Sequence, residues 1–141
     1  MTRAELQTIF ERYMDTWKRR DPAALAAYHA LDGVVESPMY QTRRGSKEIE
    51  EAYRAFFTSF PDATQAVETL IIDPPQVAAF STITGTHVNE WFGLPGTNRR
   101  IEIRHARLLQ IDENGLIAHE RRVYDFTGLL VKVGVLRAKP A

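Results

Sequence analysis

The chain has 141 residues, of which 44% are apolar and 10% aromatic, enough for one domain whose core needs neither a disulfide nor a metal. The absence of cysteine excludes disulfides, thiolate nucleophiles and thiolate zinc sites. Eighteen basic residues balance eighteen acidic ones, so no overall field attracts nucleic acid or an anionic membrane, and neither is expected as a partner.

No targeting or membrane-spanning segment is predicted. The N-terminus carries charges from Arg3 to Arg12 and lacks the apolar stretch of a signal peptide. No apolar run approaches the ~18–20 residues that a membrane helix requires. The predicted location is therefore the cytoplasm.

The first predicted element is an amphipathic helix. It begins at Thr2, which forms a capping-box pattern with Glu5 three residues later. Apolar residues then recur at three- and four-residue spacing as far as Trp17. This spacing places them in one wide stripe along the helix, which predicts that the stripe packs against the core.

Two more helices and a short strand are predicted before residue 63. Asp21, followed by proline at the first helical position, favours a short helix over residues 23–29. Residues 34–37 are typical of a strand, which a proline then stops. Ser46 is a suitable cap for a third helix over residues 47–60, whose apolar residues again form a stripe.

Beyond residue 63 the pattern favours strands. Four stretches rich in β-branched and aromatic residues are separated by proline, glycine and asparagine turns, and residues 127–134 form a short closing segment. Consecutive strands joined by short turns predict an antiparallel meander with the helices on its concave side. The predicted strands are residues 64–72, 76–90, 99–112 and 116–126.

Three segments carry a resemblance to a known family. They are residues 56–62 (FFTSFPD), the loop 93–100 (GLPGTNRR) and the ending 124–130 (YDFTGLL), which continues to residues 134–136. Together with the order of elements, they resemble the SnoaL-like polyketide cyclases, which belong to the wider nuclear transport factor 2-like fold. The resemblance covers nearly the whole chain, so residues 1–141 are expected to form a single SnoaL-like domain.

The resemblance implies an α+β fold shaped like a cone. A curved, mostly antiparallel sheet and three N-terminal helices would enclose a pocket for a small-molecule ligand. It also implies a homodimer or homotetramer, and catalysis without a metal or an organic cofactor.

Asp125 is the candidate catalytic residue that follows from the resemblance. In the polyketide cyclases an aspartate near the end of the last strand is the general acid/base for an aldol ring closure, and Asp125 lies at the matching place. One carboxylate can both remove and return the proton if apolar surroundings raise its pKa toward neutrality. The alternative is that Asp125 caps the segment that follows it.

His105 is the second candidate catalytic residue, as a hydrogen-bonding or proton-relay partner. The alternation of its strand sends His105 and Arg107 inward with Ile101 and Ile103. The alternative is a histidine that is hydrogen-bonded within the core.

The turn at residues 113–115 decides whether Asp125 shares the face of His105. A two-residue turn pairs Asp125 with Arg104 on the polar face, and a three-residue loop pairs it with Ile103 on the inward face. The hydrophobic pattern favours the second arrangement. That arrangement also turns His119 and Arg121 inward, which indicates either a polar pocket lining or a bulge.

Further side chains are predicted to bind substrate. Aromatic rings can wall a flat, apolar ligand, and indole N–H groups suit a pocket rim. Glu36 precedes Ser37 and a proline in a pattern that is loosely similar to the base segment of ketosteroid isomerase, although a solvated strand edge also explains it. The predicted substrate-binding residues are Tyr13, Trp17, Glu36, Tyr40, Phe57, His87, Trp91, Arg107 and Arg121.

No metal site or nucleotide cofactor is predicted. The four histidines form no pair at i, i+4, and the chain has neither a P-loop nor a Gly-x-Gly-x-x-Gly or Gly-x-Ser-x-Gly motif. With the resemblance, the sequence predicts an enzyme that acts on a small, mostly apolar carbonyl compound by aldol-type cyclisation, isomerisation or hydration. The alternative is a non-catalytic binding protein of the same fold.

Overall fold

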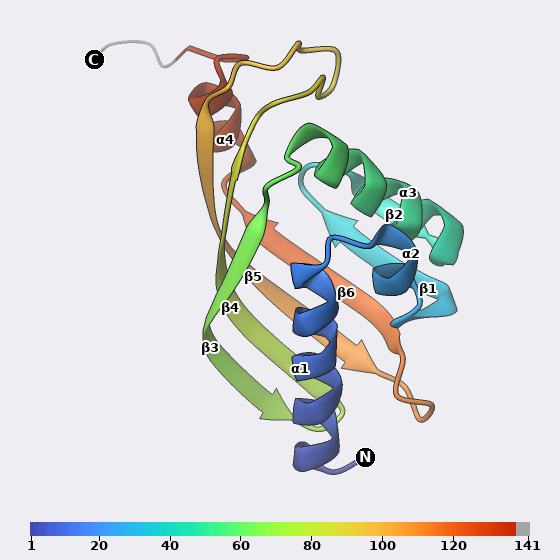
Figure 1. Cartoon of the computed structure of the whole chain (residues 1–141). Coiled ribbons are helices and arrows are strands. Elements are labelled where there is room, and N and C mark those ends of the chain that lie inside the picture. Colours follow the sequence, from blue (N-terminus) through green and yellow to red (C-terminus); the bar gives the residue numbers. More distant parts are fainter. Residues whose placement is uncertain (138–141) are drawn as a thin grey trace.

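A curved sheet with helices against one face forms the protein, as seen in the computed structural model, which describes residues 1–137 (Figure 1). Helices α1, α2 and α3 cover the concave face, and α4 lies at the far end beside β5. The elements in chain order are α1 (Arg3–Lys18), α2 (Pro22–Ala26), β1 (His29–Ser37), β2 (Gln41–Arg44), α3 (Gly45–Ser59), β3 (Thr64–Asp73), β4 (Gln76–Thr86), β5 (Arg100–Ile111), β6 (Ile117–Tyr124) and α4 (Phe126–Val133).

The sheet has the strand order β2-β1-β6-β5-β4-β3. All neighbouring strands are antiparallel except β1 and β6, which run parallel. The expected α+β fold with a curved, mostly antiparallel sheet and three N-terminal helices is therefore confirmed. Among residues 1–137, no helix has the length and apolar character needed to cross a membrane.

The caps that the sequence predicts for the first two helices are present in the structure. The Thr2 hydroxyl accepts a hydrogen bond from the amide of Glu5 at 3.2 Å, and the Glu5 carboxylate accepts one from the Thr2 amide, which completes the capping box. Asp21 caps α2 by accepting from the Ala24 amide at 3.1 Å. The expected Ser46 cap is wrong, because α3 begins at Gly45, two residues earlier than predicted, and Arg44 occupies the N-cap position.

Several strand boundaries differ from the prediction. Residues 41–44 form β2, a short edge strand beside β1, where none was expected. The predicted strand over residues 76–90 ends at Thr86, and the chain then enters an irregular loop in which Trp91 bridges Leu94. The closing segment forms α4, which ends at Gly134 in the left-handed conformation (φ 87°).

The pairing of β5 with β6 decides which side chains face the concave side. Ile111 pairs with Ile117, but Gln110 pairs with His119, so Ala118 is an extra residue in a bulge. Because one extra residue reverses the alternation, the following even-numbered residues of β6 turn inward. The predicted inward position of Arg121 is therefore wrong, and Arg121 is exposed.

Candidate active site

A cavity lies between the concave face of the sheet and helices α1 and α3. Its empty volume is about 480 Å³, including the mouth. Apolar side chains form one part of the wall, and hydroxyl, imidazole and guanidinium groups form the other. The lining residues are Trp17, Ser37, Met39, Tyr40, Ala52, Tyr53, Phe56, Ile83, Ile103, His105, Arg107, Arg122 and Tyr124.

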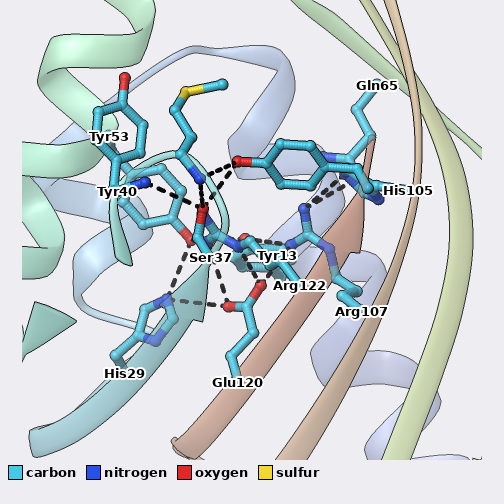
Figure 2. A network of polar contacts seen from close by, with 12 residues as sticks. Tyr13, His29, Ser37, Tyr40, Tyr53, Gln65, His105, Arg107, Glu120 and Arg122 are labelled. Atoms are coloured by element: carbon cyan, nitrogen blue, oxygen red, sulfur yellow. Dashed lines mark hydrogen bonds and ion pairs between the residues drawn. The ribbon is translucent and has the colours of Figure 1, made fainter. Parts of the chain in front are cut away.

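Two arginines and one glutamate form an ion cluster in the polar wall (Figure 2). Glu120 is fully buried, and its Oε2 lies 2.6 Å from Arg122 Nε and 3.4 Å from Arg107 Nη1. Burial by itself would raise the pKa of Glu120, but Arg122 and Arg107 outweigh it and lower the pKa to about 2. Glu120 is thus a carboxylate at neutral pH, engaged by both guanidinium groups.

Buried tyrosine hydroxyls hold the two guanidinium groups in place. Arg107 Nη1 donates to the Tyr13 hydroxyl at 2.6 Å, and Arg122 Nη2 donates to the Tyr53 hydroxyl at 3.1 Å. The two hydroxyls lie 2.6 Å apart, and His29 Nε2 lies 3.1 Å from that of Tyr53. Burial raises the pKa of Tyr53, so its hydroxyl stays protonated. These fixed partners restrict the guanidinium orientations.

His105 stands beside this cluster on β5 and lines the cavity. Its Nε2 lies 3.3 Å from Arg107 Nη2. Because a guanidinium only donates, Nε2 is the acceptor, which assigns the ring proton of the neutral imidazole to Nδ1. Nδ1 is buried and has no hydrogen-bond partner among residues 1–137. Burial and the charge of Arg107 lower the pKa of His105 to about 3, so the ring is neutral near pH 7.

Tyr124 adds a hydroxyl to the same wall. It accepts a hydrogen bond from the Met39 amide at 3.0 Å and lies 2.8 Å from the Ser37 hydroxyl. Tyr40, in the turn after β1, has a buried hydroxyl with no partner among the described residues. Burial raises the pKa of both Tyr40 and Tyr124, so both are hydrogen-bonding groups rather than bases at neutral pH.

No metal-binding arrangement is found in the part of the chain that the structure describes. There, no three side chains among His, Asp and Glu come together in a group that could hold an ion. The cavity instead offers neutral hydrogen-bonding groups and the two guanidiniums.

The sequence model of the SnoaL-like polyketide cyclase family matches residues 7–132. The chain belongs to the SnoaL-like polyketide cyclase family. Family membership supports a cyclase-type enzyme. No curated protein is similar enough to match the chain.

Solved structures share the fold of this SnoaL-like chain. AclR from Streptomyces galilaeus is 23% identical, with a TM-score of 0.85 over 99% of this chain and 87% of its own. TsrD from Streptomyces laurentii is also 23% identical, with a TM-score of 0.82 over 96% of this chain and 99% of TsrD. SalBIII, described as an epoxide hydrolase/cyclase-like enzyme in pyran ring formation in the polyether salinomycin, is 17% identical, with a TM-score of 0.75 over 88% and 93%. These similarities support the expected nuclear transport factor 2-like fold.

Four of the predicted site residues line the cavity of this SnoaL-like domain: Trp17, Tyr40, His105 and Arg107. They come from α1, the turn after β1, and β5. The alternation of β5 was sufficient to place His105 and Arg107 correctly on the concave side. That these residues bind or transform a substrate stays a prediction.

Four other predicted substrate-binding residues are buried but do not line the cavity. Tyr13 lies behind Arg107 as its hydrogen-bond partner. Phe57 packs against Trp17, with ring centroids 4.9 Å apart. His87 and Trp91 contact each other and Phe60 in the core, so neither forms part of the cavity lining.

Asp125, Glu36 and Arg121 lie away from the cavity. Asp125 is exposed, and its Oδ1 accepts a hydrogen bond from the Gly128 amide at 2.8 Å as the N-cap of α4. The expectation that Asp125 faces the pocket is wrong, because the bulge in β6 turns this end of the strand over and α4 uses the carboxylate as a cap. Glu36 pairs instead with His119 at 2.6 Å, and both side chains are about half exposed.

The sequence analysis missed Arg122 and Tyr124, which line the cavity, and Glu120, which is fully buried and pairs with Arg122. They occupy alternate positions on β6, so they share one face. The sequence did contain a signal for them. The favoured register sent two polar residues, His119 and Arg121, into the core, which conflicts with the usual burial of apolar side chains. A bulge, the second of the two explanations considered, resolves that conflict.

Proposed function

We propose that this protein is a cyclase-type enzyme that acts without a cofactor on a small, mostly apolar carbonyl compound. Family membership and the division of the cavity into an apolar and a polar wall support this proposal. The apolar wall suits a flat hydrocarbon body, and the polar wall suits a carbonyl oxygen. The reaction is an aldol-type cyclisation, or an isomerisation or hydration that passes through the same kind of enolate.

The observation that carries the proposal is the position of His105. Its Nδ1–H has no partner among residues 1–137, and its ring lines the cavity. A neutral imidazole oriented in this way donates a hydrogen bond to a substrate oxygen and stabilises the negative charge that develops on it. Such a donor acts more strongly in surroundings of low dielectric constant, and the His105 side chain is buried.

In the proposed aldol step, a proton leaves the carbon beside the substrate carbonyl to water, and the electron pair moves onto the carbonyl oxygen. The resulting enolate carbon attacks a second carbonyl group of the same molecule and forms the new carbon–carbon bond. The alkoxide that this attack produces then takes a proton from water. His105 and Arg122 stabilise the enolate oxygen, and Asp125 has no part in the step.

Exchange of the α-protons of 2-tetralone in deuterated water tests this step, because enolate formation precedes every reaction in the proposed class. We expect the wild-type protein to accelerate the exchange followed by proton NMR. His105→Phe is expected to lower the rate by ~10²–10³-fold, the usual cost of losing one oxyanion donor. Asp125→Asn is the matched control and is expected to leave the rate unchanged.

Two results would contradict the proposal in different ways. If Asp125→Asn abolishes exchange while His105→Phe retains it, the assignment of His105 is wrong. If 2-tetralone binds to the wild-type protein and is recovered without deuterium, the protein is better described as a non-catalytic small-molecule-binding protein of the same fold.

A further inference from the structure

We infer that the cavity binds its substrate as an oxyanion, either a carboxylate or the enolate of a 1,3-dicarbonyl compound. The reason is that guanidinium groups outnumber carboxylates in the polar wall. The inference names the substrate class for the site proposed above and rests on that proposed function. It stands on the ion cluster of Arg107, Glu120 and Arg122 and on the open position beside it.

The charges in the cluster do not cancel. Arg107 and Arg122 both pair with Glu120, and no other carboxylate of residues 1–137 forms an ion pair with either of them. The two neighbouring histidines are neutral and add no charge, because burial lowers the pKa of His29 to about 4 and that of His105 to about 3. Near pH 7 the cluster therefore carries one positive charge in excess.

An excess charge in this position is unfavourable unless something compensates it. The side chains of Arg107 and Glu120 are almost completely buried, at 2% and 0% exposed. The hydroxyls of Tyr13 and Tyr53 accept hydrogen bonds from the guanidiniums but are neutral. A buried charge that the protein leaves unpaired is stabilised when a ligand of the opposite charge enters the same space.

Arg122 has one free nitrogen for such a ligand. Its Nε and Nη2 are engaged by Glu120 and Tyr53, whereas its Nη1 makes no hydrogen bond to any residue in the described range 1–137. The side chain is 15% exposed and lines the cavity. A hydrogen bond from a guanidinium N–H group to an oxygen anion is charge-assisted and roughly twice as strong as one between neutral groups.

The rest of the cavity selects among anions. Much of the remaining wall is apolar, with Trp17, Phe56, Ile83 and Ile103 among its residues. A small hydrated ion would leave this wall unused, whereas a flat apolar body with one oxyanion fills both parts. An ionised 1,3-dicarbonyl compound would also need no protein carboxylate to remove its proton, which is consistent with the position of Asp125 outside the cavity.

Isothermal titration calorimetry with a matched pair of ligands tests the inference. We expect 2-naphthoate to bind to the wild-type protein at least about tenfold more tightly than 2-naphthamide, which has a similar shape and no charge. Equal affinities, or tighter binding of the amide, would overturn the inference. 1,3-Indandione, titrated as its enolate, then separates the two sources: tighter binding than 2-naphthoate assigns an enolate, and weaker binding assigns a carboxylate.

Two neighbouring arginines provide the variant and its control. Arg122→Gln is expected to abolish the preference for 2-naphthoate, whereas Arg121→Gln removes an exposed arginine on the outer face and should leave it unchanged. If both variants lose the preference equally, the affinity for 2-naphthoate depends on the overall charge of the protein and not on Arg122, and the inference fails. Arg122→Lys keeps the charge, so it should retain a preference for 2-naphthoate and serves as the test if Arg122→Gln does not fold.

This measurement is independent of turnover. A protein that prefers 2-naphthoate but exchanges no α-protons would refute the proposed function and leave the oxyanion site standing. A protein that exchanges α-protons but binds 2-naphthamide as tightly as 2-naphthoate would refute the oxyanion site and leave the proposed function standing.

Discussion

Replacing Glu120 with glutamine tests whether this carboxylate holds the two arginines in the core. A pKa of about 2 in place of the ordinary 4.5 corresponds to about 3 kcal/mol of stabilisation. The usual cost of removing one member of a buried ion pair is of similar size, ~3–5 kcal/mol, because the other member is left unpaired. We therefore expect Glu120→Gln to lower the free energy of unfolding by about 3 kcal/mol at pH 7.

Urea unfolding followed by tryptophan fluorescence measures this loss, first at pH 7 and then at decreasing pH. Because the pKa of Glu120 is lowered in the folded state, its stabilisation is present above about pH 4.5 and is lost as the pH falls toward 2. The wild-type protein should lose stability across that window, and the variant should lack this part of the loss. Glu36→Gln is the control, since its half-exposed pair with His119 contributes less than about 1 kcal/mol.

The double variant Glu120→Gln/Arg122→Gln sharpens the test. It removes one of the two guanidiniums that the single variant leaves without a carboxylate, so it should be more stable than Glu120→Gln alone. The reasoning is refuted if Glu120→Gln costs no more than Glu36→Gln, or if the double variant is the less stable of the two. Either result would mean that the guanidiniums do not need Glu120.

Three further predictions concern other parts of the molecule. The free energy of unfolding should begin to fall below about pH 6.5 in urea titrations, because the pKa values of His29 (about 4) and His105 (about 3) are lowered in the folded protein and the unfolded chain therefore binds protons first. His105→Gln should make this decline less steep, and an unchanged slope would contradict the prediction. Asp125→Ala should cost about 1 kcal/mol through the lost cap of α4, and a loss of several kcal/mol would show a larger role. Phe80 and Val123 lie in one row across the outer face of the sheet and are 48% and 62% exposed, so we expect them to contribute to a homodimer. Light scattering should find a dimer for the wild-type protein and a monomer for Phe80→Asp, and a monomeric wild type would exclude this interface.

The parts of the fold that could be predicted from the sequence depend on local interactions. The start of α1 follows from Thr2 and Glu5, which lie within one turn of each other. The inward face of β5 follows from the alternation of Ile101, Ile103, His105 and later residues, which does not depend on the partner strand. In both places the residues that decide the structure are neighbours in the chain.

The candidate site could be predicted only in part, because half of its polar wall depends on a non-local pairing. The bulge at Ala118 occurs where β6 pairs with β5 on one side and runs parallel to β1 on the other. Near this point the pairing of β1 with β6 is also irregular, between His29 and Val34. Since β1 is far from β6 in the sequence, no pattern within residues 117–124 fixes where the alternation reverses.

The ion cluster is better explained by what it does to a ligand than by what it does for the fold. Apolar residues of similar size can replace buried ion clusters with little or no loss of stability, and a cluster with an unequal number of charges is less favourable than a matched pair. Arg107 and Arg122 nevertheless share the single carboxylate of Glu120, with His105 neutral beside them. An arrangement that is costly for folding and open toward a cavity is typical of a site in which the missing charge is supplied by the substrate.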